Sequence, residues 1–315
     1  MEIRHIGGLS VSVVGLGCNN FGRRIDAEAS AAVVSAALDM GINFFDTADR
    51  YGYGDQPFSG QGRSEEFLGK ALAAHRSDVV IATKFGIAMS DDSTDRGGKP
   101  DYVHRACEAS LRRLGTDYID LYQIHRPDPG TPIDETLGAL SELVQAGKAR
   151  EVGCSNFSPS QLDDAMRASS EQRLVRFESV QNEYSLLHRE PEADVLPACE
   201  KHGVAFLPYF PLASGLLTGK YTKGEAPPEG TRLAFWQPRK HLNLSNATLE
   251  RVERLSEFAR SRGHGLLELA MSWLAARPAV ASVIAGATSP EQVRSNAGAA
   301  GWSLTGEEIA ELDQI

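Results

Sequence analysis

The chain has 315 residues, of which 42% are hydrophobic and 23% are charged, and its formal net charge at pH 7 is −10. This composition excludes disordered, collagen-like and low-complexity proteins, and the acidic balance argues against a broad surface for nucleic acid. The longest apolar runs are far shorter than the ~18 residues that a membrane span needs, and no signal peptide precedes them. We therefore expect a cytoplasmic protein without nucleic-acid or membrane partners.

Short apolar runs alternate along the chain with amphipathic segments of helical period. The first residues, Glu2–Ser12, are predicted to form a hairpin around Gly7-Gly8. Eight strands are predicted to follow: Val13–Gly17, Asn43–Asp46, Val79–Lys84, Ile119–His125, Glu151–Ser155, Ser179–Asn182, Val204–Tyr209 and Ser282–Ala285.

The segments between the predicted strands read as helices. The clearest are Ala27–Asp39, Asp101–Leu114, Pro132–Ala146 and Ser158–Ala168. Asp101 and Ser158 are predicted N-caps, and Pro159 suits a first helical position. Four glycines follow helical runs, as helix ends require: Gly41, Gly115, Gly147 and Gly203. Nearer the carboxyl terminus, Thr248–Arg262 and Thr305–Ile315 are also predicted helices, the second with a capping box at Thr305 and Glu308.

Strict alternation of strand and helix predicts a parallel sheet, and continuous apolar runs predict strands buried on both faces. Eight such units favour a closed (β/α)₈ TIM barrel over an open doubly wound sheet. No linker divides the sequence, so we expect a single domain over residues 1–315. The irregular stretch Tyr221–Asn246 is too long for an ordinary connection and is predicted to be a functional loop.

Polar residues stand at the ends of three successive predicted strands. Asp46 ends the second strand and leads into Tyr51, Lys84 ends the third, and His125 ends the fourth. Each alone has an ordinary structural explanation, but in a barrel the carboxyl ends of the strands form the active site. An acid and an amine that point into one site are expected to pair, because an unpaired buried charge is costly.

The four side chains together suggest a tuned proton donor. A free phenol has a pKa near ~10, and a neighbouring ammonium is expected to lower it. Asp46 would keep Lys84 charged, and His125 would orient a carbonyl. None of these groups carries a hydride, whereas a nicotinamide does.

The run from Gly41 to Gly52, Gly-Ile-Asn-Phe-Phe-Asp-Thr-Ala-Asp-Arg-Tyr-Gly, resembles the second-strand signature of the aldo-keto reductases. Ile81-Ala-Thr-Lys-Phe-Gly and Tyr118-Ile-Asp-Leu-Tyr-Gln-Ile-His resemble the third- and fourth-strand motifs of that family. The similarity extends from about Gly15 to Ala300 and is strongest to the branch of bacterial reductases and potassium-channel β subunits. It implies a catalytic tetrad of Asp46, Tyr51, Lys84 and His125, the cofactor NADP(H) and a small-molecule carbonyl substrate.

The resemblance also implies a cofactor site. Ser155, Asn156 and Gln181 would contact the carboxamide, and Tyr209 would stack on the nicotinamide. The other implied cofactor-binding residues are Phe210, Pro211, Leu212, Ser214, Leu216, Gly286, Thr288, Gln292 and Asn296.

The residues expected to bind the 2′-phosphate of NADPH differ from those of some family members. Some members use a Lys and an Arg where this chain has Gly286 and Gln292. In the branch that it resembles, a Lys and an Arg further upstream bind this phosphate, and Lys220 and Arg232 fit those roles, with Arg294 a weaker candidate. NADPH is therefore favoured over NADH. The run Gly15-Leu-Gly is interpreted as a turn at the rim, because the third glycine of a dinucleotide fingerprint comes two residues late. No metal-binding spacing is present, so no metal is expected.

Two other functions remain open. The first is a regulatory barrel that binds NADPH and senses redox state, and the second is an enzyme that uses Lys84 as a Schiff-base nucleophile. Substrate choice is assigned to loops, namely Tyr53–Gly62, Ile87–Lys99 and the region of Phe235 and Trp236. Arg126, beside His125, either attracts an anionic substrate such as a sugar phosphate or faces solvent.

Overall fold

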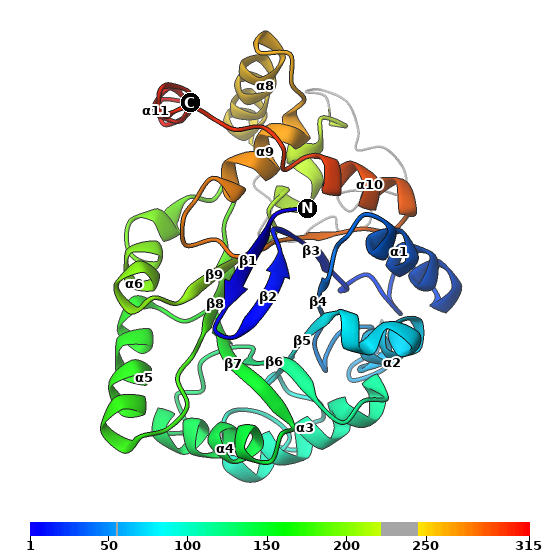
Figure 1. Ribbon diagram of the computed structural model, residues 1–315, viewed down its shortest axis with the longest axis vertical. Coiled ribbons are helices and arrows are strands. Elements are labelled where there is room, and N and C mark those ends of the chain that lie inside the picture. The colour runs from blue at the N-terminus through cyan, green and yellow to red at the C-terminus, as the bar shows by residue number, and fades with distance from the viewer. Residues whose placement is uncertain (55, 222–244) are drawn as a thin grey trace.

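Eight parallel strands form the centre of the molecule in the computed structural model, which describes residues 1–54, 56–221 and 245–315 (Figure 1). Their spatial order is β10-β3-β4-β5-β6-β7-β8-β9. The strands are β3 (Val14–Gly17), β4 (Phe44–Asp46), β5 (Val80–Phe85), β6 (Ile119–Ile124), β7 (Ala149–Ser155), β8 (Ser179–Glu183), β9 (Ala205–Tyr209) and β10 (Val283–Gly286).

The two edges of this sheet meet, so that it closes into a barrel. Phe206 in β9 donates a backbone hydrogen bond to Ala279 at 2.7 Å, and Ala281 donates one back to Phe206 at 3.0 Å. Residues 279–281 lead directly into β10, which is the opposite edge strand. The predicted (β/α)₈ TIM barrel is therefore confirmed.

An amino-terminal hairpin covers one end of the barrel (Figure 1). It consists of β1 (Ile3–Ile6) and β2 (Leu9–Ser12), which pair antiparallel as expected. Ile6 and Val11 of the hairpin form an apolar cluster with inward-facing strand residues such as Val80, at the amino end of β5. The hairpin thus fills the amino-terminal end, and the carboxyl-terminal strand ends lie at the other end.

Helices surround the sheet and bury their apolar faces against it (Figure 1). The α-helices are α1 (Ala27–Asp39), α2 (Arg63–Leu72), α3 (Pro100–Leu114), α4 (Ile133–Gln145), α5 (Pro159–Gln172), α6 (Val195–His202), α8 (Asn246–Ser261), α9 (Leu266–Ala275), α10 (Pro290–Gly298) and α11 (Gly306–Leu312). Among the described residues, the short 3₁₀ helices are η1 (Ala73–Asp78), η2 (Glu190–Glu192) and η3 (Ala213–Thr218). Within the described parts of the chain, none of the helices combines the length and apolar character that a membrane crossing requires.

The helix N-caps agree with the sequence predictions at two helices and differ at a third. Ser158 caps α5 and forms a full capping box with Gln161, and Thr305 does the same with Glu308 at α11. The predicted N-cap Asp101 is wrong, because α3 begins at Pro100 after Lys99. Proline suits this first turn since its φ is already helical and no N–H is needed there. The predicted functional loop falls almost wholly on residues 222–244, outside the described residues.

Gly69 allows α2 and α3 to approach each other closely. A Cβ at this position would lie 2.2 Å from the carbonyl oxygen of Leu114 and 2.6 Å from its carbonyl carbon. Both atoms belong to the backbone at the end of α3, so the contact cannot be relieved by a side-chain rotation. Gly138 in α4, by contrast, has open space around the same position.

We expect Gly69→Ala to destabilise the protein by about 1–3 kcal/mol, because the added methyl group forces α2 away from α3. The matched change Gly138→Ala is expected to stabilise it by about 0.5–1 kcal/mol through helix propensity. Urea unfolding of both variants measures the difference. Equal effects of the two substitutions would contradict the close packing of α2 on α3.

Candidate active site

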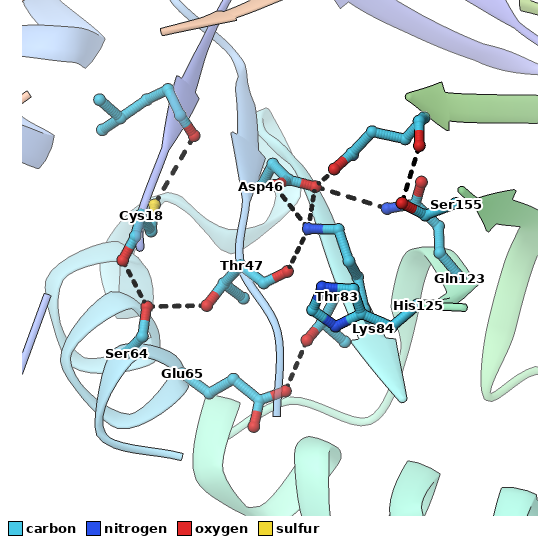
Figure 2. Close-up of polar contacts among 12 residues, drawn as sticks. Cys18, Asp46, Thr47, Ser64, Glu65, Thr83, Lys84, Gln123, His125 and Ser155 are labelled. Carbon is cyan, nitrogen blue, oxygen red and sulfur yellow. Dashed lines mark hydrogen bonds and ion pairs between the residues drawn. The ribbon is translucent and has the colours of Figure 1, made fainter. Parts of the chain in front are cut away.

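A buried ion pair between Lys84 and Asp46 lies at the carboxyl ends of β4 and β5 (Figure 2). The Lys84 Nζ donates to Asp46 Oδ1 at 2.8 Å, to Asp46 Oδ2 at 2.6 Å and to the Thr47 carbonyl at 2.9 Å. Lys84 is fully buried and Asp46 is 3% exposed. All three ammonium protons therefore have acceptors, which is the condition for tolerating a buried charge pair.

Two amide side chains from other strands hold the carboxylate in place. Gln181 in β8 donates through Nε2 to Asp46 Oδ1 at 2.9 Å, and Gln123 in β6 donates to the same oxygen at 3.4 Å. Gln181 was assigned to a cofactor amide from the sequence, and here its amide nitrogen contacts Asp46. Gln123 was not singled out, although its place two residues before His125 points it to the same side of β6.

Tyr51 and His125 lie beside this ion pair. The Lys84 Nζ is 5.0 Å from the centre of the Tyr51 ring, and the rings of Tyr51 and His125 meet edge-on with centroids 5.8 Å apart. Burial acts to lower the pKa of Lys84, but the Asp46 charge and the neighbouring Tyr51 raise it by more, so the net shift is upward. The structure therefore brings together all four residues that were predicted from the strand ends.

The direction of the Tyr51 shift differs from the sequence expectation. Burial raises the pKa of Tyr51, and the lowering effect of Lys84 only partly offsets it. Burial is the main reason, and Asp46, which holds the ammonium, adds to it by raising the pKa of Tyr51 as well. In this structure the phenol is therefore a protonated group at neutral pH, held next to a charged amine.

His125 is a neutral imidazole at neutral pH. Its pKa lies well below the ordinary value, first because it is desolvated and then because the charges of Lys84, Arg126 and Arg50 oppose protonation. Its backbone is fixed on both sides: the His125 N–H donates to Phe85 at 2.8 Å, and its carbonyl accepts from Asn156 Nδ2 at 3.0 Å. A neutral ring can still donate one hydrogen bond to a carbonyl oxygen.

A second set of polar residues lies at the end of β7 and is hydrogen-bonded to the residues around Asp46 through Gln181. Ser155 Oγ donates to the Gln181 carbonyl at 2.7 Å, and the Tyr209 hydroxyl donates to Asn156 Oδ1 at 2.8 Å. Asn156 adopts a left-handed φ of 63°, which turns its amide back toward His125. Ser155, Asn156, Gln181 and Tyr209 thus lie together, as expected from the sequence.

The segment after β9 has an unusual backbone. Phe210, Ala213, Ser214 and Gly215 have left-handed φ values of 53°, 44°, 58° and 101°. Successive backbone N–H groups in such turns can form an anion-binding concavity. A Cβ at Gly215 would lie 3.2 Å from the Lys220 Nζ, so Lys220 approaches the same segment.

Of the other residues that were assigned to this segment, Pro211 and Leu216 are buried and Leu212 packs against the core. Their side chains therefore serve the fold, which leaves the backbone groups for a ligand. Arg232 lies outside the described residues.

The residues around β10 and α10 are only partly available for a ligand. The Gln292 Oε1 accepts from the Thr288 backbone N–H at 2.9 Å and from its hydroxyl at 3.2 Å, so this side chain is already bonded to the residue before the helix N-cap, Ser289. Asn296 is buried on the inner face of α10. A Cβ at Gly286 would lie 3.4 Å from the side chains of Asn19 and Asn20, which leaves a narrow gap at the strand end. Arg294, the weaker candidate, is exposed and pairs with Glu291 at 3.7 Å.

A polar layer behind the ion pair was not anticipated from the sequence (Figure 2). Glu65 in α2 is fully buried and accepts from Thr83 Oγ1 and from Arg113 Nε, both at 2.6 Å. Thr83 directly precedes Lys84, so this layer fixes the backbone that carries the ammonium. In the sequence, the signal for this layer was Glu65, an acidic residue on the buried face of the helix Arg63–Leu72.

Asp49 is also buried, neither of its oxygens has a hydrogen-bond partner, and burial raises its pKa well above the usual value.

The groups present fit a nicotinamide dinucleotide. Ser155 provides a hydroxyl and Asn156 an amide, and Tyr209 provides an aromatic face. The left-handed backbone of residues 213–215 suits a pyrophosphate. Lys220 adds a cation at the end of that segment. Among the described residues, no three His, Cys, Asp or Glu side chains come together as a metal site would require.

Comparison with known proteins shows which family the sequence matches. Residues 13–315 match the model of the Aldo/keto reductase family. The chain is 35% identical to aldo-keto reductase YhdN of Bacillus subtilis, over 98% of this chain and 91% of that protein. It is 34% identical to L-glyceraldehyde 3-phosphate reductase of Escherichia coli O157:H7, over 100% of this chain and 92% of that protein. It is also 36% identical to a probable voltage-gated potassium channel subunit beta of Arabidopsis thaliana, over 94% of this chain and 90% of that protein. The chain belongs to the aldo/keto reductase family, whose members are oxidoreductases that act on small carbonyl compounds.

Proposed function

We propose that this chain is an NADPH-dependent reductase of aldehydes or ketones in which Tyr51 is the general acid. The observation that carries the proposal is the contact between a fully buried ammonium and the Tyr51 side chain. Lys84 is held by both oxygens of Asp46 and by the Thr47 carbonyl, 5.0 Å from the centre of the phenol ring.

In the proposed mechanism, the substrate carbonyl oxygen sits between Tyr51 and His125. The neutral imidazole of His125 donates a hydrogen bond that orients this oxygen. As negative charge develops on it, the Tyr51 hydroxyl transfers its proton, and the Lys84 ammonium stabilises the phenolate that remains. Bound NADPH supplies the hydride.

The residues around Tyr209 are proposed to bind the cofactor. Tyr209 would stack on the nicotinamide, and Ser155, Asn156 and Gln181 would face its carboxamide. Lys220 would contact the 2′-phosphate, together with Arg232, and the backbone from Phe210 to Leu216 would hold the pyrophosphate. Gly286, Thr288, Gln292 and Asn296 are proposed for the adenosine half, where Gly286 would let the ligand approach Asn19 and Asn20.

The other two hypotheses are distinguishable from this one. A Schiff-base role for Lys84 is disfavoured, because its amine is doubly ion-paired and its pKa is raised, which leaves no free lone pair. A regulatory role is suggested only by the names of relatives such as the plant channel subunit. That role would give tight NADPH binding without turnover.

We also propose that the chain forms one domain and acts in the cytoplasm. The four cysteines, Cys18, Cys107, Cys154 and Cys199, are free and buried. Thiols of this kind are compatible with a reducing compartment. Burial is the largest influence on each of them and raises its pKa, so none is a ready nucleophile.

Removing the Tyr51 hydroxyl is the direct test of the proposed acid. We expect Tyr51→Phe to lower kcat/KM for 4-nitrobenzaldehyde by about 10²–10⁴-fold, because general acid catalysis contributes a factor of this size. NADPH binding, followed by fluorescence quenching, is expected to stay near the wild-type value. Tyr118→Phe, at the amino end of β6, is the control and should keep full activity. Wild-type turnover by Tyr51→Phe would refute the role of this phenol.

The cofactor preference is tested at Lys220. We expect wild-type protein to bind NADPH more tightly than NADH, and Lys220→Gln to weaken NADPH binding by about 10–100-fold, as for a lost hydrogen bond to a charged group. NADH binding should change little, since NADH has no 2′-phosphate. Lys201→Gln, which removes an exposed charge on α6, is the control. Equal weakening of both cofactors by Lys220→Gln would contradict the assignment.

A further inference from the structure

Two arginines stand on either side of the Tyr51–His125 pair. Arg50 precedes Tyr51 in the loop after β4, and Arg126 follows His125 at the end of β6. In the sheet order, β5 with Lys84 lies between these two strands. Arg50 and Arg126 therefore follow the two strands on either side of the strand that carries Lys84, at the carboxyl-terminal end of the barrel.

Neither arginine is neutralised by a carboxylate among the described residues. Arg50 is partly buried and donates through Nη1 to the Ala88 carbonyl at 2.9 Å, and its charge also acts on the buried neighbour Asp49, with which it forms no ion pair in the described part of the chain. Its guanidinium also lies 5.5 Å from the centre of the Tyr53 ring. Arg126 is exposed and forms no hydrogen bond or ion pair in the described structure.

Their charges reach the reactive groups. Arg126 and Arg50 both lower the pKa of His125, and Arg126 also acts to lower the pKa of Tyr209. Glu183, at the end of β8, acts on the pKa of Tyr209 in the opposite direction. The positive charge of the two arginines is therefore felt at His125, where it would attract an anion.

We propose that the preferred substrates carry an anionic group, a carboxylate or a phosphate, on the same small molecule as the carbonyl. Arg126 contacts this group and Arg50 adds its field, so these two arginines determine specificity. The guanidinium fork suits either anion, because both offer two oxygens in a bidentate arrangement. This inference rests on the proposed reductase activity of Tyr51 and adds the class of substrate.

Matched substrates separate the charge from the rest of the molecule. 4-Carboxybenzaldehyde and methyl 4-formylbenzoate differ in one carboxylate, and glyceraldehyde 3-phosphate and glyceraldehyde differ in one phosphate. For wild-type protein we expect kcat/KM to be at least about tenfold higher for the anionic member of one or both pairs. The pair that shows the preference identifies the anion.

Variants locate the effect. Arg126→Gln is expected to reduce the ratio of anionic to neutral kcat/KM by about tenfold, mainly through KM. Arg50→Gln should reduce it in the same direction. Arg167→Gln removes an equal charge from an exposed ion pair on α5 and should leave the ratio at the wild-type value. A wild-type ratio near one for both pairs, or equal losses for anionic and neutral members in Arg126→Gln, would overturn the inference. Failure of wild-type protein to reduce even the neutral aldehydes would instead count against the proposed function.

Discussion

The ion pair of Lys84 and Asp46 is the contact on which the arrangement of the site depends. A lysine ammonium that is fully removed from water is costly unless all of its protons are accepted. Two carboxylate oxygens and one carbonyl accept them here, at 2.6–2.9 Å. Because Asp46 belongs to β4 and Lys84 to β5, the pair can form only when these strands are in register, with Asp46 opposite Ala82. The barrel therefore builds the site as it closes.

The layers around the ion pair have separate tasks. Gln181 and Gln123 bond the carboxylate from β8 and β6, so four strands converge on one group. Behind it, Thr83, Glu65 and Arg113 fix the strand that carries Lys84 to α2 and α3. The close approach of these helices at Gly69 keeps that support rigid. Tyr51 and His125 lie on the loop side, where a ligand can reach them.

Much of this arrangement could be predicted from the sequence. Strand ends occur where apolar runs meet polar residues, so Asp46, Lys84 and His125 could be located from periodicity and the geometry of a barrel. The capping residues Ser158 and Thr305 carry local signals that do not depend on tertiary structure. The start of α3 was misplaced by one residue because Pro100 and Asp101 are both good first-turn residues.

Other features depended on tertiary contacts and could not be predicted. The balance of burial against the Lys84 charge at Tyr51 is set by how much water is excluded, which no local pattern encodes. The contact from Gln181 to Asp46 joins residues 135 positions apart. The pairing of Glu65 with Arg113 required knowing that α2 packs on α3.

The ionisation of Lys84 is the most direct measure of the central contact. NMR of protein labelled with ¹³C at lysine Cε follows its titration. We predict that Lys84 in the wild-type protein stays charged beyond the ordinary lysine pKa of 10.5, since Asp46 and Tyr51 raise its pKa by more than burial lowers it. In Asp46→Asn, desolvation would be largely unopposed and the pKa of Lys84 would fall below that value. A wild-type Lys84 that becomes neutral below 10.5, or that titrates identically in both proteins, would contradict this account.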